Sequence, residues 1–371
     1  MRRRALLAAG FAGLSGLAGC AASGGERTST PRPDGERPSG PSTPGQPGTP
    51  PAVGGGADLP DGVYVQRFRE GMAMQGTASA GPYTVGLMYA APHVFWTVSG
   101  TDLGRVERAG DVHLMAVVWD PETRTVLPEA GVSVEVTRDG ELVSEEVIYP
   151  MLSQGMGFHY GANFGLDGDG EYLARVSVGG LGVRRTGALE GRFGDPATVE
   201  LPFAFTETER RTVTVRELDA YGERGAVRPA EMGMPQALAP EASALPGRVL
   251  GTATSDDARL ATTVLDGPPA GIEEEGPYLA VSARTRYNRM VLPAMALEAM
   301  LSRAGETAFE GALVRTLDPD LGYHYGTALR GVGFESGDEL TLTPTLPPQV
   351  ARHEGYERAF LRMDPATLAV E

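Results

Sequence analysis

The sequence contains no lysine and only one cysteine, and both scarcities limit what the protein can be. All 32 basic residues are arginine, against 48 Asp and Glu residues, for a formal net charge of -16. An acidic surface of this kind stays hydrated at high salt and argues against nucleic acid as a partner. Because Cys20 is the only cysteine, no disulfide can form within the chain. We interpret the acidity as halophilic adaptation, which by itself assigns no ligand.

Common signatures of catalysis are also missing from the sequence. It has no Gly-Lys-Ser/Thr phosphate loop, no Gly-x-Ser-x-Gly elbow and no cysteine placed for nucleophilic work. After the first twenty residues, no apolar run is long enough for a membrane-spanning helix. We therefore predict that the protein is not an enzyme and that its mature form does not span the membrane.

The first twenty residues have the features of a lipoprotein export signal. Arg2, Arg3 and Arg4 precede an apolar run, which ends in Leu-Ala-Gly before Cys20. A basic start with small residues before the cut is typical of secretory signals, here of the twin-arginine type. The pattern resembles the signals of bacterial and archaeal lipoproteins. We predict residues 1–20 to be the signal, Cys20 to carry the lipid, and the protein to be anchored on the extracytoplasmic face of the cell membrane.

Residues 21–60 are rich in Gly, Ser, Thr and Pro and contain almost no large apolar side chain. Such a segment cannot bury enough apolar surface to offset the entropy of ordering, so we predict a disordered tether.

An internal repeat dominates the rest of the chain. Val126-Leu127-Pro128 recurs as Val291-Leu292-Pro293, and His159-Tyr160-Gly161 recurs as His324-Tyr325-Gly326, both at an offset of 165 residues. A constant offset over separate motifs indicates two related domains in tandem. We place the first domain at 61–217, a proline-rich connector at 218–247, and a second, degenerate copy at 248–371.

Alternating side chains predict strands in both copies. Val132, Val134 and Val136 alternate with polar residues up to an Asp139-Gly140 turn, which is typical of a hairpin. Residues 171–178 and 212–215 alternate in the same way. Residues 295–301 favour a helix by propensity, but the repeat register aligns them with the hairpin, so we predict a strand. The expected fold is all-β, with two immunoglobulin-like β-sandwiches in tandem.

Histidine and methionine side chains of the first copy form a candidate metal site. His113 and Met115 lie two residues apart on a predicted strand and therefore share one face. Met151 and His159 bracket a glycine-bearing loop whose ends could return to the same place. Imidazole suits copper, zinc and iron, whereas a thioether favours cuprous copper, so the mixture favours copper. The alternative is that these residues only pack in the core.

Three segments resemble a known family. Asp111 to Met115, Tyr149-Pro150-Met151 and Gly157 to Asn163 are similar to the periplasmic copper- and iron-binding proteins that partner high-affinity iron permeases. The resemblance covers most of residues 113–185 and, more faintly, the second copy. It implies an immunoglobulin-like domain with His113, Met151 and His159 as copper ligands, iron as a second cation, and a membrane permease as partner.

The sequence departs from this family at three places. Met115 stands where the family has a Glu associated with a second cation, which makes iron doubtful there. The loop from Met151 to His159 is one residue longer. Arg185 aligns with the family's fourth ligand, a His, and an arginine cannot ligate a cation. With a three-residue slip in the offset, His353 of the second copy aligns with Arg185, and we hypothesise that His353 completes the site.

Three further interpretations stay open at this stage. The chain could be a metal-free surface protein whose sandwiches bind a protein or a glycan, because the fold alone does not fix function. His93 lies among large apolar residues and is most simply a core residue, with an auxiliary ligand as the alternative. Met72 and Met74 share one strand face, either as paired thioethers or as a packing stripe.

Overall fold

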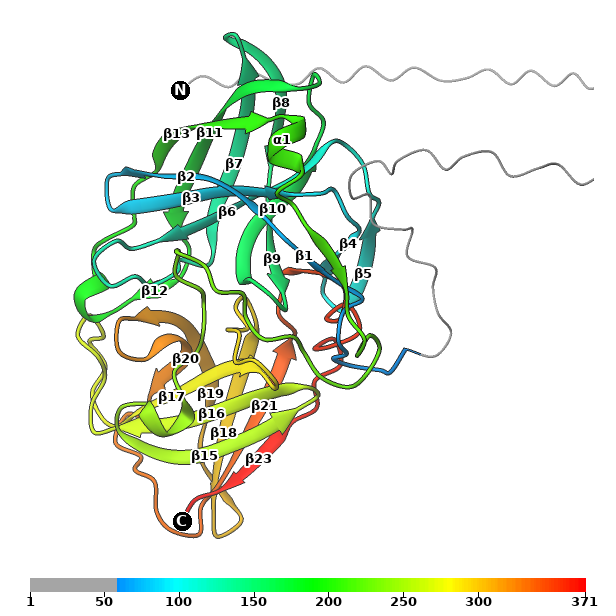
Figure 1. Ribbon diagram of the computed structural model, residues 1–371. Helices are drawn as coiled ribbons and strands as arrows, with labels where there is room; N and C mark the ends of the chain where they lie inside the picture. Colours follow the sequence, from blue (N-terminus) through cyan, green and yellow to red (C-terminus); the bar gives the residue numbers. More distant parts are fainter. Residues whose placement is uncertain (1–58) are drawn as a thin grey trace, which may run out of the picture. The chain divides into compact units, whose positions relative to one another are not determined.

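Strands make up nearly all of the regular structure in the computed structural model, which describes residues 59–371 (Figure 1). Within these residues the helical elements are α1 (Glu207–Arg210) and the 3-10 turns η1 (Gly187–Leu189) and η2 (Ala242–Ala244). The all-β prediction is therefore confirmed. The predicted signal, Cys20 and most of the predicted tether lie outside the described residues. No helix among residues 59–371 has the length and apolar character needed to cross a bilayer.

The first half, which we define as residues 61–217, contains two facing sheets. Its strands are β1 (Phe68–Glu70), β2 (Ala73–Ala80), β3 (Tyr83–Ala90), β4 (Phe95–Ser99), β5 (Asp102–Val106), β6 (Val112–Trp119), β7 (Ala130–Arg138), β8 (Glu141–Val147), β9 (Tyr149–Ser153), β10 (Gly157–Phe164), β11 (Gly170–Leu181), β12 (Arg184–Arg185), β13 (Ala197–Phe205) and β14 (Val215–Glu217). One sheet has four strands in the order β13-β11-β7-β8. The other has eight, in the order β2-β3-β6-β10-β9-β22-β4-β5. A small third sheet pairs β1 with β14.

The second half, residues 248–371, is built from the remaining strands. They are β15 (Arg248–Ser255), β16 (Ala258–Leu265), β17 (Tyr278–Thr285), β18 (Ala296–Arg303), β19 (Glu306–Asp318), β20 (Gly322–Ala328), β21 (Glu339–Leu346), β22 (Ala351–Arg352) and β23 (Ala366–Ala369). Strand β22 pairs with strands of the first half. The other strands of the second half are hydrogen-bonded in the order β15-β16-β17-β20-β19-β18-β21-β23.

A single strand, β19, joins the two layers of the second half, whereas the first half has two strands in its place. The first part of β19 pairs with β18 and its end pairs with β20. In the first half Ile148 separates β8 from β9, and Pro150 is the second residue of β9. Proline has no backbone N–H to donate to a ladder, so the chain leaves one sheet and enters the other here.

Each half lends a two-residue strand to the other, which the sequence did not predict. Strand β22 of the second half lies between β9 and β4 of the first, parallel to β9, with Ala351 opposite Met151. Strand β12 of the first half pairs in parallel with β19, with Arg184 opposite Thr316. Figure 1 shows the red segment near residue 350 reaching the sheet that carries β9 and β4. The exchange therefore places side chains of one half inside the sheet of the other.

Alternation along the eight-stranded sheet separates a packing face from a second face. On one face Leu114 and Tyr160 are buried in the hydrophobic core, and the Tyr160 hydroxyl donates to Leu127 O in the segment that leads into β7. The neighbouring positions His113 and Gly161 point the other way, because strand side chains alternate. Sandwich packing thus uses one face and leaves the other to the histidines.

Most local predictions agree with the structure. The hairpin forms from β7 and β8 around Asp139 and Gly140, and both of these residues have positive φ. Residues 295–301 form most of β18 rather than a helix, because pairing with β19 and β21 on both sides decides the backbone. The strand expected at 212–215 was wrong: Thr212 ends the turn after α1, and the strand begins at Val215.

The two copies of His-Tyr-Gly place their tyrosines identically, which generates a stability prediction. Tyr160 accepts from Ala130 N at 2.9 Å and donates to Leu127 O, and Tyr325 accepts from Met295 N at 3.1 Å and donates to Leu292 O. Tyr325→Phe leaves two buried backbone groups without a partner, so we expect the free energy of unfolding to fall by about 1–3 kcal/mol. Chemical denaturation checks this, with Tyr149→Phe as the control because Tyr149 is 42% exposed. Equal losses in both variants would contradict the assignment.

Candidate metal centre

Three neighbouring strands bring His113, Met151 and His159 to one place. His113 lies on β6, His159 on β10 and Met151 on β9. Met151 and His159 are direct cross-strand partners, and His113 pairs with Asn163 of β10. The longer loop between Met151 and His159 does not separate them, because β9 and β10 pair antiparallel on either side of a turn at residues 154–156. All three side chains are fully buried.

The second half contributes His353 to this group. The backbone N–H of His353 donates to Leu152 O and continues the pairing of β22 with β9. Its Nε2 lies 3.3 Å from Sδ of Met151, and its ring centre lies 5.1 Å from that of His159 and 5.6 Å from that of His113. The structure thus brings together four of the predicted site residues, one of them from the other half of the chain.

His93, which the sequence favoured as a core residue, lies in the same group. Its Nε2 is 3.0 Å from Nδ1 of His353, and its ring centre is 4.1 Å from that of His113. Nitrogen atoms of His93, His113 and His353 lie within 4.8 Å of one another. The core interpretation is wrong, because the His93 side chain borders a cavity instead of being enclosed. Its position before β4 carries no periodic signal, so only the three-dimensional structure reveals it.

Hydrogen bonds assign the protons on His113 and His159. His113 Nδ1 lies 2.8 Å from Oδ1 of Asn163, and His159 Nδ1 lies 3.1 Å from the carbonyl oxygen of Gly157. Oxygen acceptors require the proton on Nδ1. The amide of Asn163 is oriented by its Nδ2 group, which donates to His93 O. The Nε2 atoms of His113 and His159 therefore present lone pairs, and both are buried without a hydrogen-bond partner.

Hydrogen bonds also assign the protons on His93 and His353. His93 Nδ1 faces Ala91 O at 3.0 Å and a carboxylate oxygen of Glu70 at 3.4 Å, so it carries a proton. When His93 is neutral, its Nε2 accepts from His353 Nδ1, which leaves a lone pair on His353 Nε2 facing Met151 Sδ. Two acceptor atoms facing each other at 3.3 Å are stabilised by an electrophile that both can bind. A cation is such an electrophile.

Burial keeps these imidazoles neutral, which is the form that binds a metal. Removal from water lowers the pKa of His159 to about 4. Burial is also the main cause that lowers the pKa values of His113 and His353 well below the usual range, and repulsion by the neighbouring histidines adds to it. At neutral pH the group therefore offers nitrogen lone pairs without a proton to displace.

Glycine at position 161 makes room for the donor atoms. A Cβ at Gly161 would lie 2.9 Å from Nε2 of His113 and 3.2 Å from Sδ of Met151. Both donor atoms therefore lie over the same point of β10. Only glycine leaves this space open, which gives the Gly of His-Tyr-Gly a physical role.

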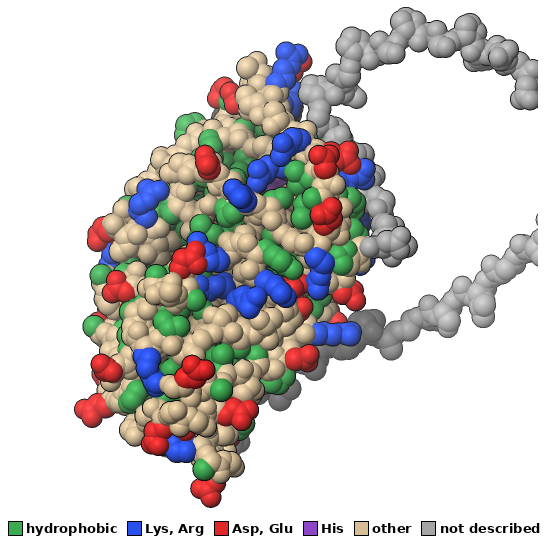
Figure 2. All heavy atoms as spheres, turned by 60° about the horizontal axis from the view of Figure 1, so that its bottom comes forward, with side chains coloured by type: hydrophobic (Ala, Val, Ile, Leu, Met, Phe, Trp, Pro, Cys, Tyr) green, Lys and Arg blue, Asp and Glu red, His purple; other side chains and the backbone are tan. Residues whose placement is uncertain are grey.

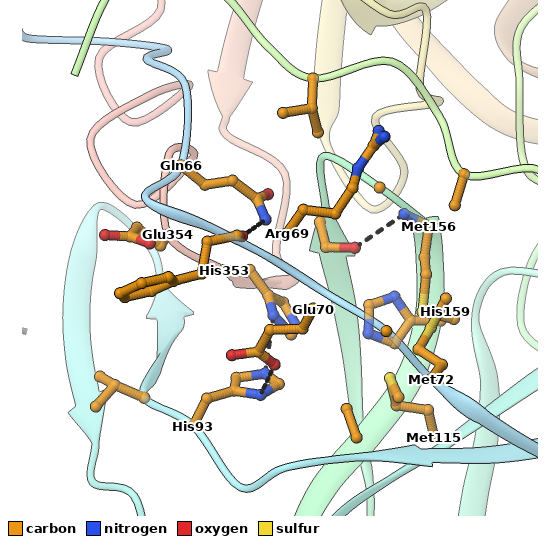
Figure 3. A pocket seen from close by; sticks show the side chains of 18 of the residues that line it. Gln66, Arg69, Glu70, Met72, His93, Met115, Met156, His159, His353 and Glu354 are labelled. Carbon is orange, nitrogen blue, oxygen red and sulfur yellow. Dashed lines mark hydrogen bonds and ion pairs between the residues drawn. The ribbon is translucent and has the colours of Figure 1, made fainter. Parts of the chain in front are cut away.

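A cavity of about 630 Å³ borders the group (Figure 3). His93, His159 and His353 line it, while His113 and Met151 lie behind this wall. Met115, which the sequence also predicted for the site, lines the cavity wall. Figure 3 shows Met115 on the side of His159 and Glu70 beside His93. Part of the predicted connector covers the cavity, namely Val227 and residues 230–233.

The alignment of Arg185 with His353 was wrong by one residue. Thr186 N donates to Leu317 O as His353 N donates to Leu152 O, and Leu317 is the repeat partner of Leu152. Thr186 is therefore the counterpart of His353, and Arg185 that of Arg352. The error arose because the insertion between the copies shifts the offset by two residues here, not three, and loop insertions leave no mark in a sequence of this kind.

In the second half the matching place is filled by protein groups. Tyr278, Thr316 and His324 stand where the first half has His113, Met151 and His159. Arg184, the counterpart of Ala351, donates to the hydroxyls of Thr316 and Tyr278 and to Gly326 O. Nε2 of His324 pairs with the Tyr278 hydroxyl at 3.0 Å. Every polar atom named here has a hydrogen-bond partner, whereas Nε2 of His113 and Nε2 of His159 in the first half have none.

A model of one protein family matches this chain over residues 88–178 and 243–369, which include the four donor residues. The family is described as a domain of unknown function, DUF7350. The chain belongs to this family. Its match covers both halves and more than half of the sequence. No curated protein matches the chain.

Two solved structures are similar to part of this chain. A copper-bound variant of FetP from uropathogenic Escherichia coli is 21% identical, with a TM-score of 0.30, and covers 37% of this chain and 98% of its own. The copper-reconstituted P19 protein from Campylobacter jejuni is 19% identical, with a TM-score of 0.28, and covers 37% of this chain and 97% of its own.

Gly161→Ala tests the convergence of the donors. The new methyl group would occupy the space over which Nε2 of His113 and Sδ of Met151 meet. We expect metal binding to weaken at least about 10-fold, as for other changes that displace a ligand, while the circular dichroism spectrum stays that of a β-protein. Binding measured by competition with a chelator checks this. Unchanged affinity would show that the two donors do not act on one ion.

His324 generates a prediction for stability against pH. Burial lowers its pKa to about 4 from an unfolded value near 6.5. Between these values the unfolded chain binds a proton that the folded chain does not. The free energy of unfolding therefore falls as pH falls from about 6.5 to 4, by up to about 1.4 kcal/mol per pH unit from this group. We expect His324→Gln to have a shallower pH dependence in denaturation curves; an identical slope would contradict the burial of a neutral imidazole.

Proposed function

We propose that this protein binds copper outside the cytoplasm, through His113, Met151, His159 and His353, and supplies it to a membrane transporter. The observation that carries the proposal is the set of unpartnered donor atoms. The Nε2 atoms of His113 and His159 are buried without a hydrogen bond, and Nε2 of His353 faces the thioether of Met151. Buried polar atoms almost always have partners, so this cluster needs one that the protein does not supply.

The chemistry of the donors favours copper over other cations. Three imidazoles and one thioether form a soft and borderline donor set, and thioethers select cuprous copper. Calcium and magnesium prefer carboxylate and carbonyl oxygen, and the four donors include none. Iron has less support, because the position that could have supplied a carboxylate is Met115; Glu70 instead contacts His93. We therefore propose copper as the cargo, as Cu⁺ and Cu²⁺, with iron as a second cation only by way of the partner transporter.

The second half argues against a packing role for these histidines. His324 has the same Nδ1 contact to a carbonyl as His159, at 3.0 Å, but its Nε2 is satisfied by Tyr278. The fold can therefore provide such a partner, and in the first half it does not. A metal-free adhesion protein needs no such arrangement, which makes that alternative the weaker one.

The proposed location rests on the sequence of residues 1–20. A lipid on Cys20 would hold the protein at the extracytoplasmic face, as a metal donor for a membrane permease requires. Figure 2 shows acidic and arginine side chains interspersed on one face, so the charge of this face is not gathered into a single patch. Recognition of a permease would then depend on local contacts more than on a broad field.

Titration of the purified chain with Cu⁺ and Cu²⁺ tests the site. We expect one tightly bound ion, and at least about 100-fold weaker binding in His159→Ala and in Met151→Leu, because each loses a ligand that the sheet holds in place. The leucine variant keeps the apolar volume, which separates loss of a ligand from loss of packing.

His324→Gln is the matched control, since it alters the same motif where Nε2 already has a partner. Its copper affinity should equal that of the unmodified chain. His353→Ala tests the contribution of the second half and should weaken binding as His159→Ala does. Equal affinities in all four variants and the unmodified chain would reject the copper site.

A further inference from the structure

Three methionines lie in a row across adjacent strands. Met74 of β2 pairs with Met88 of β3, and Met88 pairs with Met115 of β6. Residues directly opposite each other in antiparallel strands share a face of the sheet. The next position in this row is Gly161 of β10, the glycine over which His113 and Met151 converge. The row therefore leads along one face of the sheet to the copper donors.

The row runs from solvent to the buried site. Met74 is 48% exposed, whereas Met88 and Met115 are buried. Met72 lies directly before β2, two residues from Met74. Met72, Met74 and Met115 all line the cavity that His159 and His353 border. Figure 3 shows Met72 and Met115 on the side of His159, away from Glu354.

Packing alone does not explain this arrangement. A methionine that only fills the core is enclosed, but Met74 leaves almost half of its surface in solvent beside an open cavity. The cavity of about 630 Å³ is also far larger than a single ion needs. Two more methionines, Met156 and Met232, border it. Thioethers are weak acceptors for water but good ligands for monovalent soft cations.

We propose that Met72, Met74 and Met115 form a second site, selective for monovalent soft cations such as Cu⁺, on the way from solvent to the four-donor site. This deepens the proposed function and rests on it only for the destination of the ion. Thioethers keep no proton and bind hard cations poorly, so the second site admits Cu⁺ and excludes Cu²⁺, calcium and magnesium. Binding there is weaker than at the four-donor site, which lets the ion move inward.

Silver titration with methionine methyl groups labelled with ¹³C tests the inference on the whole chain. Ag⁺ replaces Cu⁺ because it has the same charge and ligand preference without redox chemistry. We expect two bound equivalents in the unmodified chain, and methyl resonances of Met72, Met74 and Met115 that shift with the second. Met300 of β18 lies outside the cavity lining, so its methyl resonance should not move.

The variant Met72→Leu, Met115→Leu should bind one equivalent of Ag⁺ instead of two, while its Cu²⁺ binding stays unchanged. Met300→Leu is the matched control and should bind two. Leucine is close to methionine in volume, so both variants should fold. The inference is overturned if the unmodified chain binds a single Ag⁺ that leaves the methyl resonances of Met72, Met74 and Met115 unshifted, or if the double variant still binds two.

The two proposals fail in different ways. If Met151 alone shifts with Ag⁺, the copper site stands and the second site does not exist. If the cavity methionines shift and Met151 does not, the second site stands and the four-donor site is rejected. In His159→Ala, the shifts of Met72 and Met115 should persist, because this residue is not one of their ligands; their loss would contradict two separate sites.

Discussion

The parallel pairing of β22 with β9 is the contact on which the candidate site depends. Two residues of ladder set Ala351 opposite Met151, and the next backbone N–H fixes His353 over Leu152. The first half alone supplies only His113, Met151 and His159. The fourth donor arrives through the association of the halves, so the site and the interface form together. A metal bound to all four donors would stabilise that association by mass action, since it binds only where the halves meet.

Much of the fold follows from local patterns in the sequence. Alternation in residues 132–136 and the Asp139-Gly140 turn predicted the hairpin of β7 and β8, and the repeat register predicted β18 against its helix propensity. The shared face of His113 and Met115 was also accessible, because alternation along one strand fixes which of its side chains lie together. The resemblance to a known family implied His113, Met151 and His159 together as copper ligands.

Other parts of the site could not be read from the sequence. His93 precedes a strand and belongs to no periodic pattern, and its role depends on the position of His353, which lies 260 residues away. The match of His353 to Arg185 failed because an insertion changes the offset between the copies. The spacing of residues in the sequence does not show which residues pair across strands. The backbone hydrogen bonds of Thr186 and His353 show that these two residues correspond.

The reciprocal strands β12 and β22 give the chain a freedom that a symmetric dimer of identical subunits lacks. In such a dimer every substitution appears at both equivalent positions. Here Arg184 and Ala351 occupy matching positions but are encoded separately. Position 184 could acquire an arginine, whose guanidinium bonds to its neighbours, while position 351 kept a small alanine beside the histidines. Covalent linkage thus allows one half to specialise as scaffold and the other as receptor without either change disturbing its counterpart.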